Sequence, residues 1–111
     1  MKTIIGLAVL GVLAAFVLAC GGASLESSPA VATDQVAVKD NKFDARVIEV
    51  PAGTTVTWTW EGKHDHNVVG DGWESDKQKE GTFQRAFEAP GTYDYRCTLH
   101  GGMTGRVIVT G

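Results

Sequence analysis

Seven short segments rich in β-branched and aromatic residues run through the chain after residue 34, with Pro and Gly turn signals between them. They are QVAVKD (35–40), ARVIEV (45–50), TTVTWTW (54–60), HNVVG (66–70), TFQRAFE (82–88), TYDYRC (92–97) and GRVIVT (105–110). None has the periodicity of a helix. Turn signals about every 8–12 residues are typical of an all-β sandwich or barrel. We therefore expect an all-β fold of seven to eight strands.

Alternation within these segments predicts which side chains are buried. In TTVTWTW the residues Thr55, Thr57 and Thr59 share one face, and the packed face carries Val56, Trp58 and Trp60. The same parity in TYDYRC puts Cys97 on the face of Tyr95. Cys97 is therefore predicted to point into the core.

The first twenty residues form a different kind of segment. Lys2 precedes an apolar run from Ile4 to Leu18, which is typical of an export signal. The run ends in VLAC, which resembles the lipobox of bacterial and archaeal lipoproteins, so we expect a signal peptide over residues 1–19 and a lipidated Cys20. An uncleaved membrane anchor ranks second, and cleavage after Ala32 is a further alternative.

A small, polar segment follows, GGASLESSPAVAT (21–33). Its composition predicts a flexible tether over residues 20–33, and the remaining residues 34–111 are enough for one domain. The net charge of −3 provides no basic stripe, so we expect no nucleic-acid partner. We expect a monomer on the outer face of the cell membrane, held by its lipid, or in the periplasm.

The stretch CTLHGGM spaces Cys97, His100 and Met103 at three-residue intervals. Three residues span at most ~10 Å, so the thiol and the imidazole can bind the same ion. Gly101 and Gly102 give the loop the freedom to turn again toward Met103. If Cys20 carries lipid, Cys97 has no disulfide partner in an oxidising compartment, which favours a bound metal.

A fourth ligand must come from outside this loop, where the histidines are His64 and His66. His64 stands between charged neighbours, whereas His66 precedes the apolar residues of NVV, which favours His66 as the ligand and His64 as solvated. One thiolate, two imidazoles and one thioether are the donors of blue-copper centres. Zinc is less favoured, because structural zinc sites usually combine two or more cysteines.

From about Val36 to Thr110 the chain resembles the cupredoxins of the plastocyanin, amicyanin and halocyanin group. KHDHNVVG is similar to the first-histidine segment of that family, and APGTYDYRCTLHGGM followed by TGRVIV is similar to its closing segment. Two residues separate Cys from His, and two separate His from Met, as in amicyanin. The resemblance implies a Greek-key, cupredoxin-like sandwich that binds one type 1 copper ion.

The resemblance also implies roles for individual residues. His66, Cys97 and His100 match the family's equatorial copper ligands, and Met103 matches the axial ligand. Asn67 matches a residue that ties the two ligand-bearing segments together by hydrogen bonds.

Two further positions bear on the same match. Tyr93 matches the position at which the family forms a tyrosine corner. Leu99 is a departure, since it stands where the family very often has Pro, and this affects loop stiffness and the reduction potential.

These expectations favour a blue-copper protein that shuttles single electrons between exported or membrane redox partners, which dock transiently near His100. The alternative is a copper carrier or storage lipoprotein, and a third possibility is a metal-free adhesion sandwich. No general base beside a nucleophile and no open metal position with a catalytic carboxylate is visible, so we do not expect an enzyme.

Overall fold

The computed structural model describes residues 24–111, and in this part of the chain nine strands form two sheets. The strands are β1 (Gln35–Lys39), β2 (Lys42–Asp44), β3 (Val47–Pro51), β4 (Thr54–Trp60), β5 (Val69–Gly70), β6 (Trp73–Glu74), β7 (Thr82–Phe87), β8 (Gly91–Arg96) and β9 (Thr104–Thr110). No helix with the length and apolarity needed to cross a membrane occurs between residues 24 and 111. The prediction of an all-β fold is confirmed.

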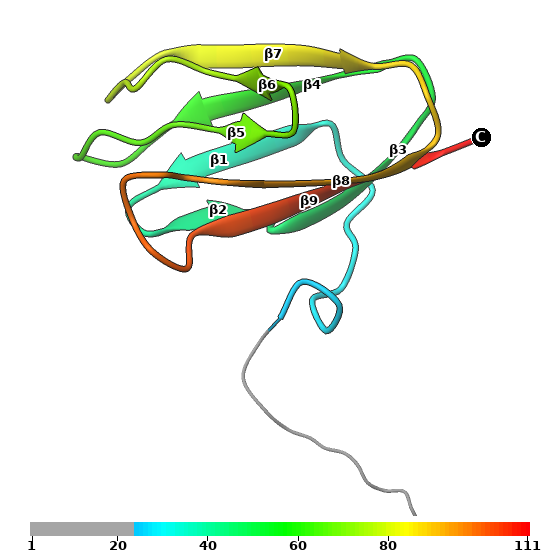
Figure 1. Ribbon diagram of the computed structural model, residues 1–111, viewed down its shortest axis with the longest axis horizontal. Coiled ribbons are helices and arrows are strands. Elements are labelled where there is room, and N and C mark those ends of the chain that lie inside the picture. The colour runs from blue at the N-terminus through cyan, green and yellow to red at the C-terminus, as the bar shows by residue number, and fades with distance from the viewer. Residues whose placement is uncertain (1–23) are drawn as a thin grey trace, which may run out of the picture.

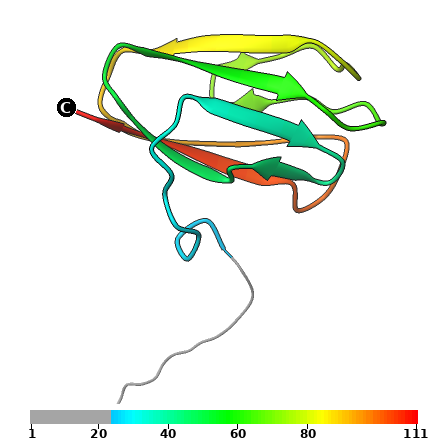
Figure 2. The ribbon, with the colours of Figure 1, turned by 180° about the vertical axis from the view of Figure 1, so that it is seen from behind.

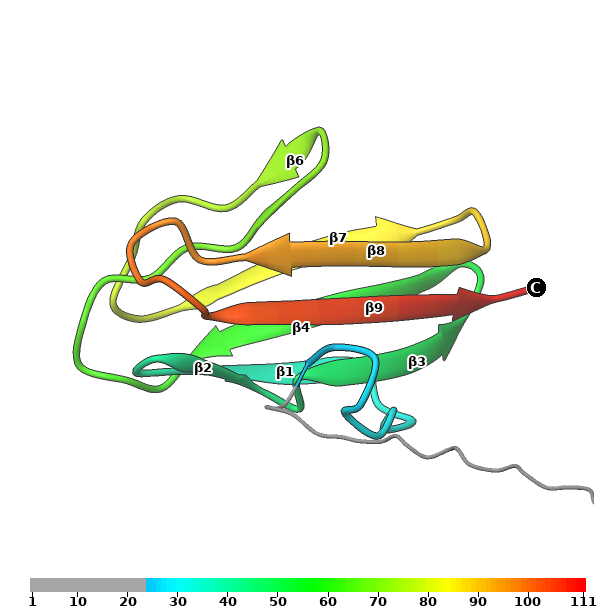
Figure 3. The same cartoon turned by 60° about the horizontal axis from the view of Figure 1, so that its bottom comes forward.

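The two sheets lie face to face (Figures 1 and 3). One has the strand order β2-β1-β4-β7, and Figure 2 shows it from its outer side; the other has the order β3-β9-β8-β5-β6. The pairs β1–β4 and β3–β9 are parallel, and the remaining pairs are antiparallel. Because successive strands often lie in different sheets, the connections between them cross the ends of the sandwich.

The strand count exceeds the predicted seven to eight because two hairpins add the short strands β2 and β6. The first hairpin turns at Asp40 and Asn41, where Asn41 has φ 71°. The second turns at Asp71 and Gly72, where Gly72 has φ 84°. Two-residue hairpin turns need positive φ, which Asn and Gly adopt most readily.

The predicted core face of β4 is confirmed, since Val56, Trp58 and Trp60 are all buried. The ring of Trp58 contacts aromatic rings of both sheets, with centroid separations between 5.3 and 6.3 Å, and these neighbours are Trp73, Phe83, Phe87 and Tyr95. Each such pair contributes about 0.5–1.5 kcal/mol beyond the burial of its area. The two sheets are therefore joined through an aromatic centre.

Two polar side chains support this aromatic centre from its rim. The guanidinium of Arg85 lies 5.0 Å from the ring centroid of Trp73 and 4.4 Å from that of Phe87, in the geometry of cation–π contacts. The hydroxyl of Tyr93 donates to the carbonyl of Ala89 at 2.6 Å and so links β8 to the connection before it. This bond forms the corner that the resemblance implies for Tyr93.

Contacts with the sandwich begin before β1. Val31 forms an isolated parallel bridge with Ile48, in which its N–H donates to Val47 O at 3.0 Å and its carbonyl accepts from Glu49 N at 2.9 Å. Farther toward the N-terminus, Arg106 Nη2 donates to Glu26 Oε2 at 3.2 Å. Two residues of the predicted tether, Glu26 and Val31, therefore contact the five-stranded sheet.

The connections that carry the candidate ligands leave the sandwich at one end. The β4–β5 and β8–β9 connections lie together there, together with the β1–β2 turn, and the C-terminus lies at the opposite end (Figure 1). This arrangement brings residues near 40, 66 and 100 into one region.

Candidate metal centre

The β8–β9 connection holds Cys97 and Met103 at its two ends. Cys97 directly follows β8 and Met103 directly precedes β9, so the two sheet strands set both positions. Both side chains are buried, with 3% and 1% of their surface exposed. The N–H of Cys97 donates to the carbonyl of Met103 at 2.9 Å, which closes the connection at its base.

His66 lies in the β4–β5 connection and is fully buried, with 0% exposure. Its backbone forms a two-bond bridge with Gln78, in which each N–H donates to the other residue's carbonyl at 3.0 Å. The indole Nε1–H of Trp60, at the end of β4, also donates to the His66 carbonyl at 3.0 Å. The position of His66 is therefore set by three hydrogen bonds to its main chain.

Two of the predicted donors face each other directly. His66 Nδ1 lies 3.8 Å from Cys97 Sγ, and the ring centroids of His66 and His100 are 4.6 Å apart. Nitrogen and thiolate donors sit about 2.0–2.3 Å from a bound metal ion, so a separation of 3.8 Å suits two donors that share one ion. The structure therefore brings His66 and Cys97 within reach of a common ion and places His100 beside them.

The donor set matches copper better than zinc. Within residues 24–111, no group of three or more His, Cys, Asp or Glu side chains is arranged to hold a metal ion. Among these residues, the contact that the structure shows between predicted ligands is therefore that of His66 with Cys97, with the ring of His100 against His66. Cys97 is a buried thiol without a disulfide partner among residues 24–111, and thiolate and thioether donors are those that copper accepts in trigonal sites with a weak axial ligand.

The structure separates the two histidines that compete for the first ligand position. His64 is exposed, whereas His66 is buried against the β8–β9 connection. The solvated environment predicted for His64 agrees with this placement.

Asn67 joins the two connections through its side-chain amide. Its Oδ1 accepts from the N–H of Thr98 at 2.8 Å, and its Nδ2 donates to Thr98 Oγ1 at 2.9 Å. Asn67 itself is 5% exposed, so both bonds lie in a largely dry environment. The residues that follow His66 and Cys97 are thereby held at a fixed separation.

Asp40 is a residue near the site that sequence reasoning missed. Its Oδ1 lies 2.9 Å from His66 Nε2, on the side of the ring away from Cys97. The hydrogen bond with His66, followed by that from the N–H of Lys63, holds the pKa of Asp40 well below its usual range. The sequence DN indicates a turn but carries no signal for a partner 26 residues away.

The site is open to solvent on the side of the β8–β9 connection. His100 is partly exposed, Leu99 is 40% exposed, and Gly101 and Gly102 are exposed. Of the two candidate imidazole ligands, His66 and His100, only His100 reaches the protein surface.

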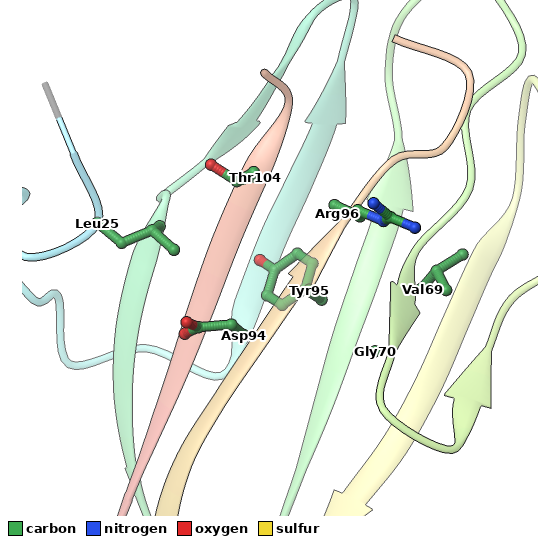
Figure 4. Close-up of a pocket in the computed structure, with 7 residues that line it drawn as sticks. All are labelled: Leu25, Val69, Gly70, Asp94, Tyr95, Arg96 and Thr104. Carbon is green, nitrogen blue, oxygen red and sulfur yellow. The ribbon is translucent and has the colours of Figure 1, made fainter. Parts of the chain in front are cut away.

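A separate pocket lies beside β8, between the N-terminal segment and the β5–β6 hairpin (Figure 4). Its lining residues are Leu25, Val69, Gly70, Asp94, Tyr95, Arg96 and Thr104. None of the four predicted metal ligands lines it, so this pocket is distinct from the candidate metal centre.

Comparison with known proteins agrees with this chemistry. Residues 30–110 match the family model described as copper binding proteins, plastocyanin/azurin family. Amicyanin-alpha of Methylorubrum extorquens is 38% identical over 94 residues, which cover 78% of this chain and 78% of that protein. Halocyanin of Natronomonas pharaonis is 46% identical over 77 residues, which cover 60% of this chain but only 47% of that protein.

Among solved structures, the reduced Cu(I) form of an amicyanin point mutant at pH 4 superimposes with a TM-score of 0.65. It is 32% identical, and the match covers 68% of this chain and 80% of that one. The match to the family model spans most of the chain and includes both connections that carry the candidate ligands. The chain therefore belongs to the plastocyanin/azurin family of copper-binding proteins, the cupredoxins.

Proposed function

We propose that this protein is a type 1 copper electron-transfer protein in which His66, Cys97 and His100 are the equatorial ligands and Met103 is the axial ligand. The observation that carries the proposal is the 3.8 Å separation of His66 Nδ1 and Cys97 Sγ, both buried, with the ring of His100 against His66. Membership of a copper-binding family supports the choice of metal.

Bound copper would supply one-electron chemistry, since it alternates between Cu(II) and Cu(I). The residues of the chain supply donors that are mostly buried. His66, Cys97 and Met103 are each at most 3% exposed, which excludes water from three of the four donor positions. Donors that keep their places in both oxidation states reduce the rearrangement that each electron transfer requires.

His100 is proposed as the point at which electrons enter and leave. Its ring is partly exposed, and the uncharged surface of Leu99, Gly101 and Gly102 surrounds it. A small apolar surface of this kind suits brief contact with redox proteins, as in interfaces of the transient class.

Electron transfer is favoured over copper delivery or storage. A carrier must exchange its metal quickly and therefore benefits from exposed donors, whereas three of the four donors here are buried. We also propose that the protein is not an enzyme, because the four donors leave no open position for a substrate.

We further propose that the protein is a monomer that acts outside the cytoplasm, held to the outer face of the membrane by lipid on Cys20. The signal peptide over residues 1–19 and Cys20 lie outside the described residues. Mass spectrometry of the membrane fraction tests this part, with loss of the lipid adduct and release from the membrane expected for Cys20→Ala.

Addition of Cu(II) to the purified apoprotein tests the metal centre. We expect an intense blue colour from thiolate-to-Cu(II) charge transfer, and its loss in Cys97→Ser. Colourless wild-type protein in the presence of Cu(II) would overturn the proposed function.

Voltammetry of the copper-loaded protein separates an electron carrier from a metal carrier. A reversible one-electron wave, without release of metal, is expected for electron transfer. Met103→Leu should retain the blue colour and shift the potential, and an unchanged potential would show that Met103 is not the axial ligand.

A further inference from the structure

Asp40 is not one of the proposed ligands, but its carboxylate forms a hydrogen bond with the ring of His66. It lies in the β1–β2 turn, and its Oδ1 is 2.9 Å from Nε2 of His66. The other ring nitrogen, Nδ1, faces Cys97 Sγ at 3.8 Å. The two nitrogens of one buried ring thus point to different partners, a carboxylate on one side and the thiol on the other.

The carboxylate of Asp40 is itself held in place. The N–H of Lys63 lies 3.0 Å from both Oδ1 and Oδ2, and the N–H of His64 donates to Oδ1 at 3.1 Å. These bonds join the β1–β2 turn to the β4–β5 connection that carries His66. The side chain of Asp40 is 31% exposed, so its outer side remains solvated while its inner side meets a fully buried imidazole.

Gly62 makes room for this carboxylate. A Cβ atom at residue 62 would overlap Oδ1 and lie 2.8 Å from Cγ of Asp40. Any larger residue at this position must therefore displace the carboxylate or the connection that carries it.

We propose that Asp40 is a positioning residue for the copper ligand His66: its carboxylate keeps the ring proton on Nε2 and leaves the lone pair of Nδ1 directed at the metal position beside Cys97 Sγ. The inference rests on the proposed function, in which His66 is a ligand. A neutral imidazole carries one N–H, and an acceptor at Nε2 determines which nitrogen keeps it. Partners of this kind orient ligating histidines and raise their basicity.

The negative charge of Asp40 has a second effect. A carboxylate one imidazole ring away from copper stabilises Cu(II) more than Cu(I), because the two states differ by one positive charge. Asp40 is therefore expected to strengthen Cu(II) binding and to lower the reduction potential.

The first measurement uses the apoprotein and needs no metal. Long-range ¹H–¹⁵N NMR spectra, recorded well above the ordinary pKa of imidazole, report which nitrogen of His66 carries the proton. Wild-type protein should show the Nε2–H tautomer, whereas Asp40→Ala and Gly62→Ala should show an increased share of the Nδ1–H tautomer. A His66 tautomer that is the same in all three proteins would overturn the proposal.

The second measurement uses copper. Loss of an outer partner of a metal-binding histidine typically costs about 10–100-fold in metal affinity, and we expect a loss of this size for Cu(II) in Asp40→Ala. Asp40→Asn keeps the size of the side chain and one acceptor oxygen, so it should fold and stay blue while its reduction potential rises. An unchanged potential in Asp40→Asn would count against the charge effect.

Asp65→Asn is the matched control. It removes the same charge from the residue next to His66, where Asp65 is exposed to solvent. The shift in potential should be clearly smaller than in Asp40→Asn, and an equal shift would overturn a specific role for Asp40. If wild-type protein binds no copper, the proposed function fails, but the NMR comparison still decides whether Asp40 positions His66.

Discussion

The two imidazoles of the candidate metal centre lie in opposite environments. His66 is fully buried, and its main chain is bonded to Gln78 and Trp60 while its ring is bonded to Asp40. His100 is partly exposed and lies in a connection with two glycines, and its carbonyl accepts a long hydrogen bond, 3.4 Å, from Met103 N. The hydrogen bonds around His66 position one imidazole, and the β8–β9 connection positions the other, His100.

This difference suits two demands on the electron carrier that we propose. The proposed interior ligand must keep its place when the charge of the metal changes, and the hydrogen bonds of His66 to Gln78, Trp60 and Asp40 serve that purpose. The outer ligand must approach a partner protein, so partial exposure is useful there. We infer that variants of the two histidines will fail in different ways.

The largest effect is expected from His66→Gly compared with His100→Gly. Both should lose the blue colour, but added imidazole should restore it only in His100→Gly, because the space left at His100 opens to solvent. His66→Gly leaves a buried cavity and should also destabilise the apoprotein by about 2–5 kcal/mol. Absorption spectra with and without imidazole, and urea unfolding of the apoproteins, provide the measurements.

Wild-type protein with added imidazole is the control and should keep its spectrum. Equal rescue of the two variants would contradict the contrast between a closed and an open ligand position.

Asn67→Ala tests the link between the two ligand-bearing connections. The variant removes the acceptor for Thr98 N–H and the donor to Thr98 Oγ1. Loss of one partner of a buried hydrogen bond costs about 1–3 kcal/mol, and we expect a loss of this size in the unfolding free energy of the apoprotein. Chemical unfolding measures it, and Thr98→Val, which removes only the hydroxyl, should cost less.

Trp60→Phe tests the support that the sandwich gives to the His66 main chain. The variant removes the Nε1–H that donates to the His66 carbonyl, but Gln78 N continues to donate to the same oxygen. Because one bond remains, we expect a loss of about 1 kcal/mol in urea unfolding, at the typical net value of a single hydrogen bond. A loss as large as that of His66→Gly would show that Trp60 acts mainly through packing.

The smallest effects are expected in the outer loop. Gly102 has φ 80°, and a Cβ there would meet no atom within 4 Å, so Gly102→Ala should cost about 1 kcal/mol through backbone strain alone. A Cβ at Gly101 would also meet no atom within 4 Å, and Gly101 does not have positive φ, so Gly101→Ala should be close to neutral. Thermal unfolding of the two variants side by side measures the difference.

The strands could be predicted from sequence because their alternation reflects burial directly. TTVTWTW is an example, since the residues predicted to face inward are the buried ones. The hairpin strands β2 and β6 were missed because segments of two or three residues are too short to show alternation. The sequence signals that could have revealed these hairpins are the turn dipeptides DN at 40–41 and DG at 71–72.

The candidate ligands could also be predicted, because CTLHGGM keeps three of them within seven residues. Asp40 could not, since its contact with His66 depends on the packing of two connections that are far apart in sequence. The need for Gly62 was invisible for the same reason: it follows from the space that the Asp40 carboxylate occupies.

The bridge between Val31 and Ile48 covers part of a sheet edge. β3 is an edge strand of the five-stranded sheet, and unpaired edge groups invite a second chain to add its own strand. Val31 occupies the carbonyl of Val47 and the N–H of Glu49, which are two of those groups. The segment that leads into the domain thus removes two of the groups to which a second chain could add a strand.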